Sequence, residues 1–158
     1  MAPLIVKTVP IASLTIDPAN ARKHPEKNLD AIRGSLARFG QQKPIVVDSS
    51  NVVRAGNGTL EAARSLGWTE IAVIVSDLAG AEMQAFAIAD NRTAELATWD
   101  DEVLQATLAA LGQEDQALLA ACGFEDFQFV EHAVREFDES IADDQITKCP
   151  QCGHEFHE

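Results

Sequence analysis

Short apolar runs punctuate the first half of the chain, and each is bounded by proline, glycine or small polar residues. Runs of four to six residues with such boundaries are typical of strands. The pattern predicts four strands, at residues 4–9, 44–48, 51–55 and 71–75. Ser49 and Ser50 lie between the second and third of these and, with Asn51, predict a hairpin turn.

In the remaining segments apolar residues recur every three or four positions, which predicts helices. The expected helices lie at residues 28–39, 59–66, 80–96, 101–111 and 115–122. Asn28 or Asp30 is expected near the N-cap of the first helix, and the last two helices are expected to form a hairpin that breaks near Gly112. The third helix offers four side chains for burial, namely Met83, Phe86, Ala87 and Ala94.

This order of strands and helices predicts an α+β fold with one small core domain. The expected domain covers residues 1–100, and residues 101–124 form a C-terminal helical extension. Residues 125–147 are acidic with scattered phenylalanines and are expected to be a linker. Residues 148–158 are expected to form a tail that resembles half of a zinc ribbon.

The stretch "RAGNGTLEAARSLG", residues 54–67, predicts a strand, a glycine turn and the start of a helix. Gly56 and Gly58 are expected to adopt positive φ angles, with Asn57 or Thr59 as the N-cap. The start of a helix presents free backbone N–H groups and the positive end of a dipole, which together favour phosphate. The turn is therefore either an anion site or only a tight turn in the chain.

Charge is distributed unevenly between the two halves of the sequence. Residues 1–68 hold nine lysines and arginines and five acidic residues. Residues 69–158 hold three lysines and arginines and twenty acidic residues, so the net charge of the chain is −13. A phosphate-bearing partner would therefore meet the N-terminal half. His24 lies in a basic loop of that half, where it either contacts phosphate or is only solvated.

Cysteine usage favours a reducing cytoplasm, because Cys122, Cys149 and Cys152 do not form the even set of a disulfide framework. Cys122 follows an apolar run and is expected to be a small buried residue. No apolar run approaches the ~20 residues that cross a bilayer, and the first residues lack the pattern of a secretory signal. The sequence predicts a cytoplasmic protein with no membrane partner.

The tail carries the second chemical signal, a pair of cysteines three positions apart followed by two histidines. This spacing lets the thiolates of Cys149 and Cys152 face one zinc ion, which needs four ligands. Either His154 and His157 complete the site, or a second chain in a homodimer supplies the missing pair. The remaining alternative is a tail with two free thiols.

Three stretches occur in an order that resembles the ParB/sulfiredoxin-like domain. They are "NARKHPEKNLDAIRGSLARFGQQKPIVV", "VVRAGNGTLEAARSLGWTEIAVIVSDL" and "AFAIADNRTAELATWDDEVL". In particular, the chain resembles the ParB-like nuclease domain of bacteriophages and mobile elements, which is often joined to DNA methyltransferases. The resemblance covers about residues 5–105 and implies the fold of that family.

The resemblance also implies a binding site for a nucleoside triphosphate with Mg²⁺, and DNA or a nucleotide and a DNA methyltransferase as partners. The residues it implies as sources of positive charge are Arg22, Lys23 and Lys43. Those that line the phosphate turn are Gly56, Asn57, Gly58 and Thr59. The motif beside the metal or ribose consists of Asp90, Asn91 and Arg92.

The glycine turn departs from the family. Partition proteins carry Gly-Glu-Arg-Arg there, sulfiredoxins Gly-Cys-His-Arg, and methyltransferase-linked relatives Gly-His-Thr-Arg or Gly-His-Gly-Arg. This chain lacks the cysteine nucleophile, which excludes reduction of a sulfinic acid. Thr59 replaces the arginine that would clamp phosphate, and Asn57 replaces the histidine that would titrate.

These departures rank the functional interpretations. The first is a nucleotide- or DNA-binding module, accessory to DNA modification, partition or packaging in a phage or mobile element. The alternative is an active metal-dependent nuclease or nucleoside triphosphate hydrolase. A third is a non-catalytic protein-interaction adaptor that uses the acidic helical half. The loss of arginine and histidine from the turn favours the first over the second.

Overall fold

The computed structural model describes residues 4–124, 126–127, 146–148 and 155–157. The chain divides into two units, Met1–Phe127 and Gln128–Glu158, and each is described by itself. Among the described residues, no helix is both long and apolar enough to cross a membrane.

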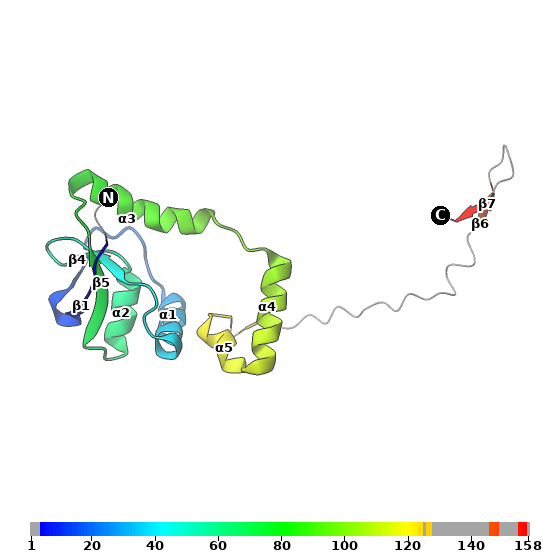
Figure 1. Ribbon diagram of the computed structural model, residues 1–158, viewed down its shortest axis with the longest axis horizontal. Coiled ribbons are helices and arrows are strands. Elements are labelled where there is room, and N and C mark those ends of the chain that lie inside the picture. Colours follow the sequence, from blue (N-terminus) through cyan, green and yellow to red (C-terminus); the bar gives the residue numbers. More distant parts are fainter. Residues whose placement is uncertain (1–3, 125, 128–145, 149–154, 158) are drawn as a thin grey trace. The chain divides into compact units, whose positions relative to one another are not determined.

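A five-stranded mixed sheet forms the centre of the first unit (Figure 1). Its strands are β1 (Val6–Pro10), β2 (Thr15–Ile16), β3 (Ile45–Val47), β4 (Val52–Ala55) and β5 (Glu70–Val75). Their order across the sheet is β1-β5-β3-β4-β2, with β1 pairing antiparallel to β5 and β2 pairing parallel to β4. The hairpin from β3 to β4 is antiparallel, and β3 runs parallel to β5.

Among the described residues, five α-helices and one 3₁₀ turn accompany the sheet. They are η1 (Ile11–Ser13), α1 (Glu26–Phe39), α2 (Asn57–Ser65), α3 (Gly80–Leu96), α4 (Asp101–Glu114) and α5 (Gln116–Ala121). Helices α1 and α2 pack against each other, and α2 buries Leu60 against the sheet residues Val47, Val53 and Val73. This packing fixes the start of α2, because burial of large apolar side chains is the main stabilising term.

The structure confirms the predicted α+β fold and the four predicted strands, and α3 has the predicted bounds. It adds β2, which has only two residues and therefore no apolar pattern of its own. Helix α1 begins at Glu26 with Pro25 as its N-cap, two residues before the predicted start, so Asn28 lies in the first turn of the helix. The Pro25 carbonyl accepts the amide of Asn28.

The break between the last two helices also differs from the prediction. Gly112 remains within α4, and the break falls at Asp115, whose carboxylate accepts the Ala117 amide and so caps α5. Two burial predictions were wrong as well: Cys122 and Ala94 are exposed, whereas Met83 is buried as expected. Ala94 is exposed because the C-terminal half of α3 extends beyond the sheet (Figure 1).

In the second unit the structure describes two paired strands, β6 (Ile146–Lys148) and β7 (Glu155–His157). They are antiparallel, with Ile146 opposite His157 and Lys148 opposite Glu155. The predicted zinc ligands Cys149, Cys152 and His154 lie outside the described residues, as does most of the acidic segment 125–147. The predicted domain boundaries stay predictions.

Candidate functional site

Gly56 is the residue on which the turn between β4 and α2 depends. Its φ angle is +95°, a region that other residues adopt only with strain, and it is the N-cap of α2. A Cβ atom there would lie 2.5 Å from Cγ2 of Ile45. Glycine is therefore required at this position both for its backbone angle, as the sequence predicted, and for its lack of a side chain.

Gly58 has a different role from the one expected. Its φ angle is not positive, because it lies in the first turn of α2, where glycine costs roughly 0.5–1 kcal/mol relative to alanine. A Cβ atom on Gly58 would lie 2.8 Å from Cε1 and from Nδ1 of His24. The glycine thus permits the imidazole ring to lie directly on the helix.

Asn57 is buried and acts as a structural link, so the prediction that it or Thr59 caps the helix was wrong. Its side-chain Oδ1 accepts the amide of Asp17 at 3.0 Å, and its Nδ2 donates to the carbonyl of Val53 at 3.1 Å. These bonds join the loop after β2 to the end of β4. The loop that carries Arg22 and Lys23 is thereby fixed beside the start of α2.

The start of α2 has the properties of an anion site. The first amides of a helix have no acceptor within the helix, and they lie at the positive end of its dipole. No acidic residue occupies the first turn of α2. The half-buried Thr59 adds a hydroxyl group to these amides.

Arg54 on β4 anchors the other side of the site. Its guanidinium donates to Asp17 at 2.8 Å and to Asp48 at 2.8–2.9 Å, and Asp17 is buried. Burial alone would raise the pKa of Asp48, but the amides of Val52 and Ser50, together with Arg54, hold that pKa below its usual value. The three charged side chains form a fixed cluster beneath the loop.

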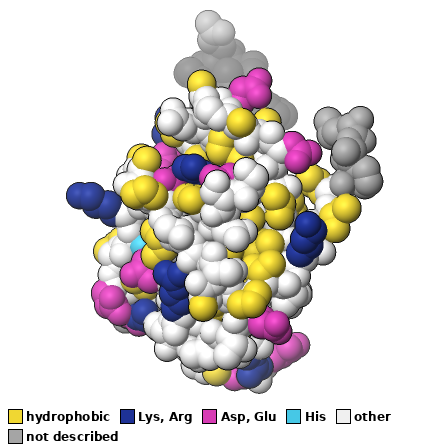
Figure 2. All heavy atoms as spheres, turned by 90° about the vertical axis from the view of Figure 1, so that its left-hand side faces the viewer, with side chains coloured by type: hydrophobic (Ala, Val, Ile, Leu, Met, Phe, Trp, Pro, Cys, Tyr) yellow, Lys and Arg dark blue, Asp and Glu magenta, His cyan; other side chains and the backbone are white. Residues whose placement is uncertain are grey.

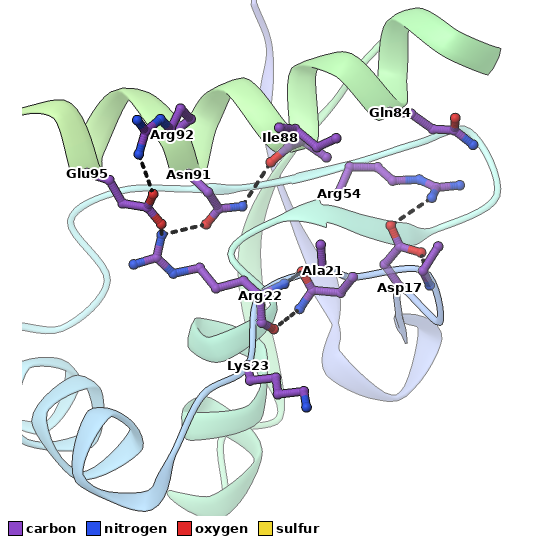
Figure 3. Close-up of a pocket in the computed structure, with 13 residues that line it drawn as sticks. Asp17, Ala21, Arg22, Lys23, Arg54, Gln84, Ile88, Asn91, Arg92 and Glu95 are labelled. Carbon is purple, nitrogen blue, oxygen red and sulfur yellow. Dashed lines mark hydrogen bonds and ion pairs between the residues drawn. The ribbon is translucent and has the colours of Figure 1, made fainter.

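Helix α3 supplies the third wall, seen in close-up in Figure 3. Nη1 of Arg22 donates to Oδ1 of Asn91 at 3.3 Å and to Oε1 of Glu95 at 3.1 Å. The other oxygen of Glu95 accepts from Arg92 at 3.2 Å. Lys23 lies on the same loop and has no ion-pair partner among the described residues.

Two adjoining cavities lie between these three walls. The larger, of about 810 Å³, is lined by loop 17–23, Arg54 and α3, including Gln84, Ala87 and Ile88. The smaller, of about 150 Å³, lies at the start of α2. Four residues line both cavities and so lie where the two meet, namely Asn20, Arg22, Arg54 and Asn91. A ligand with an anionic end and a larger uncharged part fits this arrangement.

Nine of the ten residues predicted for the binding site line these two cavities. The exception is Lys43, which lines a separate apolar groove between α1 and α4. No role was predicted for Asp17, Arg54 or Glu95, although Arg54 and Glu95 lie within the stretches that carry the family resemblance. Their roles depend on contacts between residues far apart in the sequence, which no local pattern marks.

No group of three His, Cys, Asp or Glu side chains able to hold a metal ion occurs within the part of the chain that the structure describes. Asp90 supplies the carboxylate among the described residues that line the smaller cavity, and Asn91 beside it carries an amide oxygen that accepts from Arg22; oxygen atoms of both kinds are ligands that Mg²⁺ prefers. Magnesium at such a site is commonly held by one or two protein oxygens together with phosphates of the substrate.

Comparison with known proteins identifies the family. The ParB N-terminal domain family matches residues 4–92, which is more than half of the chain. The chain belongs to the ParB N-terminal domain family. The matched residues include the glycine turn, the basic loop and Asp90, Asn91 and Arg92. No curated protein matches the sequence.

Solved structures of ParB proteins share the fold. The C-terminally truncated chromosome-partitioning protein ParB from Caulobacter crescentus, complexed with CTP-gamma-S, matches with a TM-score of 0.65 and 19% identity. That match covers 75% of this chain and 71% of the Caulobacter chain. A Pnob8-like ParB-N domain matches with a TM-score of 0.50 and 17% identity, over 75% of this chain and 48% of that one.

Proposed function

We propose that this ParB-family chain is a nucleotide-binding module whose site lies between loop 20–24, the start of α2 and the 90–92 segment of α3. The observation that carries the proposal is the convergence of nine predicted residues on two adjoining cavities. The Caulobacter ParB protein of the same fold was crystallised with CTP-gamma-S, which makes a nucleoside triphosphate the first ligand to test.

The smaller cavity suits the phosphates. The free amides of α2 and the Thr59 hydroxyl supply neutral donors, and Arg22, which lines both cavities, supplies positive charge. Lys23 adds positive charge from the wall of the larger cavity. Asp90 and Asn91 would hold Mg²⁺ together with the phosphates, and the metal would neutralise part of their charge. Because the turn itself contains no arginine, the helix amides and dipole supply most of the attraction.

The larger cavity suits a base and sugar. Ala87 and Ile88 give it an apolar wall, while Gln84 and Asn20 offer side-chain amides that both donate and accept hydrogen bonds. Charged side chains also line this cavity, so the apolar wall accounts for only part of it, and the polar groups would fix the orientation of the ligand. The two cavities together would hold the two chemically different ends of one nucleotide.

The test of this proposal is calorimetric titration of the full chain with CTP, ATP, GTP and UTP, each with and without Mg²⁺. We expect at least one nucleotide to bind, more tightly with Mg²⁺, with an affinity that falls as salt is raised. If no nucleotide binds under any of these conditions, the proposal fails.

We propose DNA as the macromolecular partner, in a role accessory to DNA modification, partition or packaging in a phage or mobile element. The excess of basic residues in positions 1–68 supports this, because phosphate contacts dominate affinity for DNA. A DNA methyltransferase is the proposed protein partner. A binding curve with duplex DNA, measured with and without nucleotide at two salt concentrations, tests the DNA contact.

Two other functions stay predictions without a specific observation in their favour. A metal-dependent nuclease or triphosphate hydrolase would show turnover that a variant of Asp90 abolishes. A protein-interaction adaptor would bind neither nucleotide nor DNA. The titrations above therefore separate the adaptor from the binding module, and a turnover assay separates the enzyme from both.

We also propose that the tail binds zinc through Cys149 and Cys152. They lie in the sequence between β6 and β7, whose end residues Lys148 and Glu155 are paired. Elemental analysis is expected to find one zinc per chain if His154 and His157 complete the site, or one per two chains in a homodimer. Protein purified under reducing, chelator-free conditions without zinc would overturn this proposal.

A further inference from the structure

The close contact between His24 and Gly58 is not explained by the fold alone. Gly58 has helical backbone angles, so neither the turn nor the helix requires a glycine there. What it permits is the approach of the imidazole, because a Cβ would lie 2.8 Å from two ring atoms and 3.1 Å from Cγ. The glycine therefore holds space for His24 at the first turn of α2.

The ring is oriented from the opposite side by α1. Nδ1 of His24 lies 2.8 Å from Oδ1 of Asn28, and an amide oxygen can only accept, so Nδ1 carries the proton. This leaves Nε2 without a hydrogen-bond partner among the described residues. His24 is half-buried and lines the smaller cavity, together with Gly58 and Thr59.

We propose that His24 is a binding residue for the ligand's phosphate and that, when protonated, it supplies the positive side chain missing from the glycine turn. The inference rests on the proposed nucleotide site. Thr59 provides no charge at that position, whereas a protonated imidazole donates through Nε2 as a charge-assisted hydrogen-bond donor. Binding then strengthens as pH falls through the range in which histidine gains its proton.

The charged groups around the ring make this protonation depend on the ligand. Arg22 and Arg54 line the same cavity, but each is paired with a carboxylate. Asp90 lines the cavity from α3, where it would hold Mg²⁺ in the proposed function, and the start of α2 lies against the ring. A phosphate at the start of α2 would therefore be the anion that a protonated imidazole contacts, so ligand and proton would bind cooperatively.

The experiment compares the wild-type chain with His24→Gln by calorimetric titration of Mg–CTP at about pH 8 and about pH 6. Glutamine retains a neutral donor and acceptor but cannot titrate. At the higher pH we expect His24→Gln to bind at least as tightly as the wild type, because Nε2 of the neutral ring is only an acceptor, whereas glutamine still offers a donor. At the lower pH the wild type should bind Mg–CTP roughly tenfold more tightly than His24→Gln, which is about the contribution of one charged hydrogen bond. Inorganic triphosphate, titrated in the same way, tests whether the effect lies in the phosphates.

Gly58→Ala provides the second arm. The added methyl group displaces the imidazole while favouring the helix. The folded variant should therefore not show the tighter binding of Mg–CTP that the wild type shows at the lower pH. In the double variant with His24→Gln, Gly58→Ala should cause no further loss, because both changes remove the same contact. An additional loss in the double variant would contradict a role through His24.

The outcomes separate this inference from the proposed function. If the wild type binds Mg–CTP and His24→Gln binds equally well at both pH values, the role of His24 is wrong and the nucleotide site stands. If neither protein binds any nucleoside triphosphate or inorganic triphosphate at either pH, the nucleotide site is wrong. A circular dichroism spectrum and unfolding curve of each variant establish that it is folded.

Discussion

The guanidinium of Arg22 lies 3.1 Å from the carboxylate of Glu95, which joins the basic loop to helix α3 along the wall of the larger cavity (Figure 3). The second oxygen of Glu95 accepts from Arg92 at 3.2 Å. One carboxylate thus neutralises two of the cations that the sequence assigns to the ligand. A phosphate must compete with Glu95 for these arginines.

Replacing Glu95 with glutamine should therefore strengthen nucleotide binding. The side chains of Arg22 and Glu95 are 41% and 49% exposed, and exposed ion pairs contribute only about 0.2–1 kcal/mol each. The expected gain in affinity for Mg–CTP is roughly threefold. Glu82→Gln is the matched control on the same helix, and calorimetry that shows equal affinities for the two variants would count against competition by Glu95.

Lys23 and Lys43 were both predicted to bind phosphate, and the structure separates them. Lys23 lines the larger cavity, whereas Lys43 lines the groove between α1 and α4. Lys23→Ala should weaken nucleotide binding by about tenfold, the loss of one charged hydrogen bond, and Lys43→Ala should leave it unchanged. The two variants have the same net charge, so a similar loss in both would mean that only the overall charge matters.

Thr59→Arg restores the positive residue that relatives carry in the turn. Thr59 lines both the smaller cavity and the apolar groove, so an arginine there has space on either side. Affinity for Mg–CTP should rise by about 1–3 kcal/mol if the guanidinium contacts the phosphates. Unchanged affinity in the variant, alongside tight binding by the wild type, would place the ligand elsewhere.

Stability should depend on pH through Asp48. Its folded pKa is lowered, so its ionised form contributes stability at pH values above about 4, the ordinary value, and that contribution is lost as pH falls through the folded pKa. Asp48→Asn should lower the free energy of unfolding at pH 7 and flatten its decline towards pH 2. Urea unfolding at a series of pH values measures this, with the exposed Asp77→Asn as control, and parallel curves for wild type and Asp48→Asn would refute it.

Local sequence pattern was enough for most of the elements. The strands β3, β4 and β5 combine apolar side chains with clear turn residues, so their positions follow from composition. β2 could not be predicted, because Thr15 and Ile16 form a strand only through their pairing with Val52 and Val53. Its existence depends on tertiary contact rather than on any local preference.

The candidate site likewise combines features that local sequence pattern predicts with features that depend on tertiary contact. The glycine turn and the basic loop were recognisable as motifs, but the ion pair of Arg54 with Asp17 joins residues 37 positions apart. Gly58 was misinterpreted because glycine serves either a positive φ or a close contact, and the sequence does not distinguish them. Lys43 was misplaced because proximity to a motif does not establish which face a side chain occupies.

The most direct test of the central claim is a two-dimensional NMR titration of the ¹⁵N-labelled chain with Mg–CTP. The account predicts that the largest shifts occur at the backbone amides of 57–60, with further shifts at 22–24 and 90–92. Residues of the groove between α1 and α4, such as Ser35 and Thr107, should remain unchanged. Shifts confined to that groove, or a bound nucleotide that leaves the amides of Gly58 and Thr59 unperturbed, would contradict the account.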